Sequence, residues 1–177
     1  MWTIIRSIEK ITRFFGFVGA WIVVVLICAM VYEVLSRYLF RSPTFWAYEI
    51  GYMLMGASFM FGIAFALQMR RHIRVDFLYD SLSPKKQALI DIIGYLFFLL
   101  PMVVWTTWGL WGYFYDAYKV GEVSGESAWN PIIWPFRFTF VVGFALLAIQ
   151  TVAEILKCIL IFKGEEIPEP EEVETRI

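Results

Sequence analysis

The side chains that could carry chemistry stand at the ends of long apolar segments. Glu33 and Arg37 lie four residues apart near the end of the first segment, a spacing that suits an ion pair on a helix. Glu49 follows at the start of the second segment. That segment ends in a basic cluster with the single histidine, His72, and an acid follows at Asp76. Such groups act in acid–base catalysis or bind metals only when the fold clusters them.

The sequence offers no pattern that would form such a site. One histidine cannot supply both axial ligands of a bis-histidine haem, and no Cys/His cluster has metal-ligand spacing. A Ser-His-Asp arrangement is not credible because His72 lies in a charged linker, and no glycine-rich phosphate loop occurs. Self-sufficient carriers place ionisable residues at mid-membrane, whereas these segment centres are nearly all apolar. We therefore expect no catalysis, metal or cofactor, and a helper or scaffold role.

Composition indicates a membrane protein with several spans. Of the 177 residues, 60% are hydrophobic and 19% are aromatic, and the mean hydropathy is +0.66. The apolar residues come in blocks, unlike the scattered pattern of soluble domains. The net charge is only −1, and the basic residues stand at segment ends, which gives nucleic-acid binding no support. Cys28 and Cys158 lie in or beside apolar blocks, which suits buried thiols and not a disulfide framework.

The blocks predict an all-α protein with four transmembrane helices, since about 20 apolar residues cross roughly 30 Å of hydrocarbon. We expect the spans at about residues 14–38, 46–69, 87–113 and 131–156. Residues 1–16 form either a short interfacial amphipathic helix or the charged flank of the first span. The linker after the second span should lie on the membrane surface. A single membrane domain would then cover residues 1–163, and the acidic tail, 164–177, should be disordered.

The distribution of lysine and arginine predicts which side each loop faces. With the N-terminus inside, eleven Lys and Arg residues fall on the inner side and four on the outer side. The outer four are Arg37, Arg41, Lys119 and Arg137. Because cytoplasmic loops carry the excess of positive charge, both termini are expected in the cytoplasm.

Two further features suggest how the spans pack. Ser58, Gly62 and Ala66 recur every four residues and form one stripe of small side chains, which lets helix backbones approach closely in lipid. Small residues are also common in membrane helices that make no such contact. Pro101 predicts a kink within the third span.

The charged residues at the outer end suggest a pairing. We expect Arg37 and Glu49 to lie on adjacent spans joined by a short loop, and we hypothesise that they form an ion pair for which Glu33 competes. The alternative is that Arg37 and Glu49 only anchor their helices at the membrane interface.

Short motifs follow one another along the spans. W-x-x-E falls on Trp46 and Glu49, and H-[IV]-x-V-D falls on His72 and Asp76. Others are R-Y-x-F at 37–40 and a proline, a glycine and a glutamine in the last span, at Pro131, Gly143 and Gln150, where Val141 replaces a second proline. Over roughly residues 16–157 this order resembles the small membrane subunit of the tripartite ATP-independent periplasmic (TRAP) transporters.

The resemblance implies a subunit of a sodium-driven importer of organic acids in a bacterial or archaeal cytoplasmic membrane. In such a transporter a periplasmic solute-binding protein captures the substrate, and a large membrane subunit binds substrate and sodium. The small subunit would pair with the large one as a scaffold and offer the binding protein a docking surface. The candidate contact residues are Arg37, Trp46, Glu49, Ser58, Gly62, Ala66, His72, Asp76, Pro131 and Gly143.

Two other readings stay open. One is a free-standing structural or sensor protein with four helices. The other is a quinone-linked membrane enzyme such as a thiol oxidase, which would need cysteine pairs near the outer surface. The resemblance implies that the substrate contacts lie in the other two proteins.

Overall fold

A computed structural model describes residues 1–69 and 82–164, which are helical apart from short connections. Three of the spanning segments are the helices α1 (Trp2–Tyr38), α2 (Ala47–Gln68) and α6 (Trp134–Phe162). The remaining one joins α4 (Pro84–Ile93), the π-helix η1 (Gly94–Leu99) and α5 (Leu100–Val120). In the described part of the chain four helical segments are long and apolar enough to cross a membrane, which confirms the predicted fold class.

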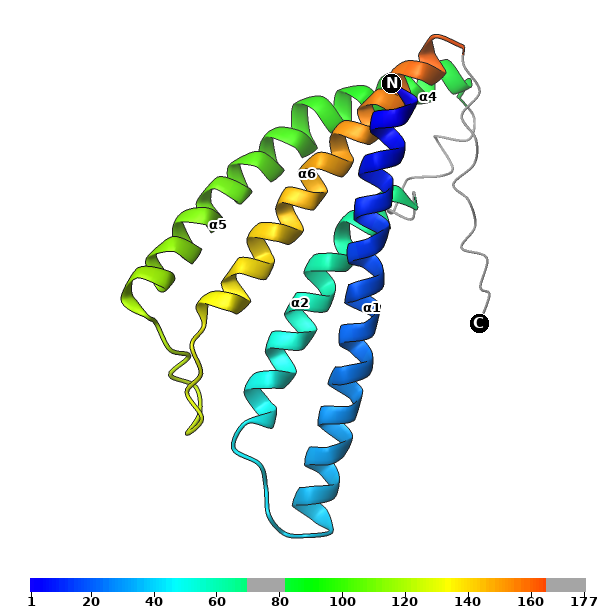
Figure 1. Cartoon of the computed structure of the whole chain (residues 1–177). Helices are drawn as coiled ribbons and strands as arrows, with labels where there is room; N and C mark the ends of the chain where they lie inside the picture. The colour runs from blue at the N-terminus through cyan, green and yellow to red at the C-terminus, as the bar shows by residue number, and fades with distance from the viewer. Residues whose placement is uncertain (70–81, 165–177) are drawn as a thin grey trace.

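The helices lie in a row and do not close into a bundle. Along the row the order is α5, α6, α2 and α1, and α1 also crosses α6 near its own beginning (Figure 1). The residues that α6 buries span most of its length, whereas α1 and α5 bury few side chains. We call the end where α1 begins and α6 ends the N-terminal end, and the opposite end the loop end. The outer helices of the row therefore leave wide apolar faces uncovered.

The first helix is longer than expected. Residues 2–38 form one continuous helix, so the interfacial segment expected at residues 1–16 and the first span are a single element. No proline interrupts this stretch, and its charged side chains are tolerated on the exposed face of a helix. At 37 residues α1 is about 55 Å long, well beyond the ~30 Å of hydrocarbon. Its length therefore exceeds what an upright helix needs to cross that layer.

The third segment is irregular just before Pro101. The Leu100 amide donates to the carbonyl of Tyr95, five residues back, at the end of η1. Because proline has no amide hydrogen, Pro101 cannot continue the ordinary pattern of the α-helix. The residues that precede Pro101 thus form a π-helical turn, and the kink expected at Pro101 stays a prediction.

Close contacts with glycine hold the centre of the row together. A Cβ atom on Gly143 would lie 2.7 Å from the carbonyl oxygen of Met60, so α6 and α2 meet here at backbone distance. On the other side of α2, a Cβ on Gly19 would lie 3.2 Å from the carbonyl oxygen of Ser58. A buried cluster of apolar side chains completes the core: Ala64, Leu67, Val103, Leu146 and Leu147.

The connection between α5 and α6 is a short hairpin-like loop, residues 121–133. Gly121 ends α5 in the left-handed conformation (φ +61°), and Val123 and Ile132 form an antiparallel bridge. Pro131 lies within this loop, where its carbonyl accepts from the Ser124 amide at 2.9 Å. The expectation that Pro131 opens the last helix is therefore wrong. Pro135, in the first turn of α6, takes that role because its missing amide hydrogen needs no partner there.

Candidate functional site

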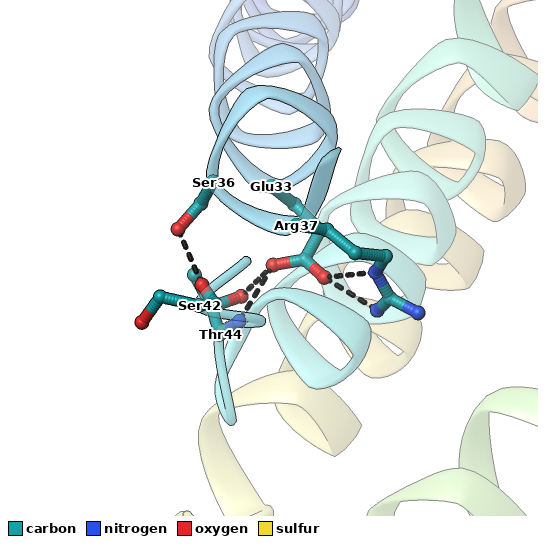
Figure 2. A network of polar contacts seen from close by, with 5 residues as sticks. All are labelled: Glu33, Ser36, Arg37, Ser42 and Thr44. Carbon is teal, nitrogen blue, oxygen red and sulfur yellow. Dashed lines mark hydrogen bonds and ion pairs between the residues drawn. The ribbon is translucent and has the colours of Figure 1, made fainter. Parts of the chain in front are cut away.

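A polar cluster ties the α1–α2 connection back to the last turns of α1 (Figure 2). Arg37 donates to Glu33 Oε1 through Nε at 2.9 Å and through Nη2. The other oxygen of Glu33 accepts from the Thr44 amide at 2.9 Å and from the Thr44 hydroxyl. The Ser36 hydroxyl donates to the Ser42 carbonyl at 2.6 Å. Glu33, buried at this point, thus organises the loop.

The predicted ion pair between Arg37 and Glu49 is wrong. Arg37 pairs with Glu33, one helical turn away, and its side chain stays 55% exposed. Glu49 is fully buried, and the Ser127 hydroxyl donates to its Oε1. A partner on the same helix needs no loop to bring it close, which explains why Glu33 wins the competition for Arg37.

Glu49 instead joins α2 to the α5–α6 loop. It lies in the first turn of α2, where the helix dipole favours an acid. Its second oxygen, Oε2, is buried and has no hydrogen-bond partner in the described residues. Trp46, just before α2, stacks on Tyr32 of α1 with ring centroids 5.8 Å apart. The start of α2 is thereby held by both of its neighbours at the loop end.

Sequence reasoning missed a second ion pair at the loop end, between buried Arg137 and partly exposed Glu122. Arg137 Nη1 donates to Glu122 Oε2 at 2.7 Å and to the Tyr113 carbonyl at 3.3 Å, and Nη2 bonds to Glu122 Oε1. The guanidinium also stacks over the Tyr113 ring at 3.6 Å. A bidentate pair of this kind fixes geometry as well as charge. The sequence signal that could have predicted this pair is an acid near the start of one short loop, Glu122, and an arginine just after the loop, Arg137.

A polar ladder joins α1 to α6 near the N-terminal end. Thr12 donates to Gln150 Oε1 at 3.0 Å, and Gln150 Nε2 donates to Glu154 Oε1 at 2.9 Å. Lys157 Nζ lies 2.7 Å from Glu154 Oε1 and also pairs with Glu9. Four of these five side chains are buried, and Glu9 is partly exposed. The spacing 150, 154 and 157 on one face of an apolar helix was the signal for this ladder.

The small-residue stripe is open to the outside. Ser58, Gly62 and Ala66 line a groove between α1 and α2 together with Gly16, Gly19 and Ala20, and its volume is about 460 Å³. A Cβ on Gly62 would meet no atom within 4 Å. The Ser58 hydroxyl is satisfied by the Met55 carbonyl at 2.8 Å. No other described span covers this α1–α2 groove.

The other sequence predictions have mixed outcomes. Gly143 stands at the closest approach of α2 and α6 described above. His72 and Asp76 lie outside the described residues. Cys158 is buried as expected, but Cys28 is exposed, because the face of α1 that carries it meets no other described helix. The described polar clusters all join helices to one another or to loops, an arrangement suited to fixing a rigid shape.

The comparisons assign the chain to a family. No curated protein matches it. The family model described as the DctQ component of tripartite ATP-independent periplasmic transporters matches residues 9–160, which is most of the chain and overlaps all four spans. The resemblance noted from the short motifs is thus confirmed. The chain belongs to the DctQ family, the small membrane component of TRAP transporters.

Proposed function

We propose that this chain is the scaffold subunit of a sodium-driven transporter that imports an organic acid, and that it has no catalytic role. The observation that carries the proposal is that the buried polar groups bind partners within this chain. Glu33 binds Thr44 of the α1–α2 connection, and Arg137 binds Glu122 of the 121–133 loop. Lys157 of α6 binds Glu9 of α1. Because these groups form hydrogen bonds and ion pairs inside the subunit, they make the row of helices more rigid. Sodium and substrate would then bind in the large subunit.

The α1–α2 groove is the proposed contact with the large membrane subunit. Helices in lipid gain little from burying apolar surface, so their association depends on close packing along small residues. Ser58, Gly62 and Ala66 line the open side of the groove, and a Cβ on Gly62 would meet no described atom within 4 Å. The exposed face of α5 carries Trp105 and Trp108, whose bulk suits contact with lipid. A transmembrane helix of the large subunit would therefore fit the groove better than the α5 face.

The loop end is the proposed docking surface for the periplasmic solute-binding protein. The α1–α2 connection is fixed by Glu33, and the 121–133 loop is fixed by Arg137 and by Ser127 on Glu49. Two fixed loops on one end of the molecule make a preorganised surface, which lowers the entropic cost of binding. The excess of lysine and arginine at the other end supports a cytoplasmic location for both termini. Labelling should then find a cysteine at Gly125 reachable from the periplasm and one at Ser83 protected.

The groove is tested by a bulky side chain that the isolated subunit can accommodate. Gly62→Leu should leave the subunit folded, because the space around Gly62 is open, but it should abolish co-purification of the large subunit and substrate uptake. The matched control is Gly109→Leu on α5, where a Cβ also meets nothing within 4 Å. Normal assembly and uptake by Gly62→Leu would show that the groove faces lipid. Sodium-dependent uptake by this subunit alone in proteoliposomes would contradict the scaffold proposal.

A further inference from the structure

A cationic cleft lies on the first turns of α1, away from the α1–α2 groove. Its lining residues are Trp2, Thr3, Arg6, Ser7 and Lys10, and its volume is about 280 Å³. The Ser7 hydroxyl donates to the Thr3 carbonyl at 2.9 Å, so its hydrogen is already used within the helix. Because α1 is longer than the apolar layer of a bilayer is thick, we expect its first turns to lie at the level of the lipid headgroups.

The two cations of the cleft are uncompensated. Arg6 and Lys10 are exposed and form no ion pair within residues 1–69 and 82–164. The single acid in the first 16 residues is Glu9, and it is engaged by Lys157 of α6. The cleft therefore presents a net positive charge to whatever lies beside it.

The same face of α1 continues as an exposed aromatic strip. Phe14, Phe17 and Trp21 follow Lys10 by four, seven and eleven residues, which places them on one side of the helix. Their exposed fractions are 62%, 63% and 57%, and the rings of Phe17 and Trp21 meet edge to face at 6.1 Å. Eleven residues of helix rise about 17 Å, close to the ~15 Å depth of one hydrocarbon leaflet.

We propose that this face binds one anionic phospholipid of the leaflet at the N-terminal end. Arg6 and Lys10 hold the headgroup phosphate, with the Thr3 hydroxyl and the Trp2 indole N–H as further donors, and the acyl chains lie along Phe14, Phe17 and Trp21. The charge of the cleft and the length of the aromatic strip match the two parts of such a lipid. Each cation near an anionic membrane surface strengthens binding by roughly fivefold, so two give on the order of 25-fold.

The test is lipid retention by the full-length subunit, measured by native mass spectrometry after incubation with mixed micelles of phosphatidylglycerol or phosphatidylcholine. The wild type should retain one phosphatidylglycerol in preference to phosphatidylcholine. The double variant Arg6→Gln/Lys10→Gln should lose about 25-fold in phosphatidylglycerol affinity. The matched control is Lys85→Gln/Lys86→Gln, which removes two exposed charges from the same end and should bind like wild type. Phe17→Ala should lose several-fold without any change of charge.

Four results would overturn the proposal. Equal losses in the double variant and its control would mean diffuse attraction without a site. Equal retention of both lipids would exclude recognition of charge. Displacement of the lipid by millimolar glycerol phosphate would mean that the cleft binds free phosphate. Loss of the large subunit from the double variant, with lipid retention unchanged, would make this face a protein contact.

Discussion

Ser127 donates a hydrogen bond to Glu49, a fully buried carboxylate that lies 78 residues earlier in the chain. The contact fastens the α5–α6 loop to the first turn of α2. The same loop is held from its other side by Glu122 on Arg137. The two contacts together give the loop end a single shape, on which any docking partner would depend.

Removal of the Ser127 hydroxyl should destabilise the subunit. Ser127→Ala leaves the buried Glu49 carboxylate without its described donor, a loss of about 1–3 kcal/mol or more for a charged group. The midpoint of thermal unfolding in detergent should fall. Ser124→Ala is the matched control, because the Ser124 hydroxyl only accepts from the Glu126 amide at 3.4 Å on the exposed loop. Equal midpoints for the two variants would contradict a role for Ser127.

Changes at Arg37 and Glu49 should act independently. Arg37 pairs with Glu33, whereas Glu49 is bound by Ser127, so the two residues share no described partner. The destabilisation of Arg37→Gln/Glu49→Gln should equal the sum of the single changes within about 0.5 kcal/mol. Arg37→Gln alone should cost no more than ~1 kcal/mol because the arginine is largely exposed. The stabilities of the wild type, the two single variants and the double variant can be compared by denaturation in a graded detergent series. A strong coupling between the two changes would favour an ion pair between Arg37 and Glu49.

The sequence predicted the spans because each is a long apolar run, and length and hydropathy are local properties. It placed Glu49 correctly at the start of its helix for the same reason. It could not predict the partners of Glu49 or Arg137, because loops far along the chain bring Ser127 and Glu122 to them. Helical spacing correctly gave the Glu33–Arg37 pair, and the error lay in preferring a partner across the loop.

A single methyl group should separate α2 from α6. In Gly143→Ala the new Cβ would lie 2.7 Å from the Met60 carbonyl oxygen, and such overpacking costs about 1–3 kcal/mol. Gly62→Ala is the control on the open groove, where the better helix propensity of alanine should leave stability equal or improved. Thermal unfolding of both variants gives the comparison. If Gly143→Ala unfolds at the same temperature as the wild type, the backbones of α2 and α6 do not meet closely at Gly143.

Loss of Lys157 should be the most damaging single change at the N-terminal end. The ammonium bonds to buried Glu154 at 2.7 Å and to Glu9, so Lys157→Met leaves two acids without their shared cation. Breaking a buried pair in this way costs about 3–5 kcal/mol. We expect poor yield and a sharply lower unfolding midpoint in detergent.

The same experiment can separate charge from packing. Lys163→Met, at an exposed position directly after α6, is the matched control and should behave like wild type. Adding Glu154→Gln to Lys157→Met replaces the buried carboxylate by a neutral amide, so the double variant should regain part of the lost stability, because an amide is cheaper to bury than a carboxylate. If Glu154→Gln lowers the unfolding midpoint further, Lys157 stabilises the subunit through the packing of its aliphatic stem. The ion pair would then not be the source of the stability of the ladder.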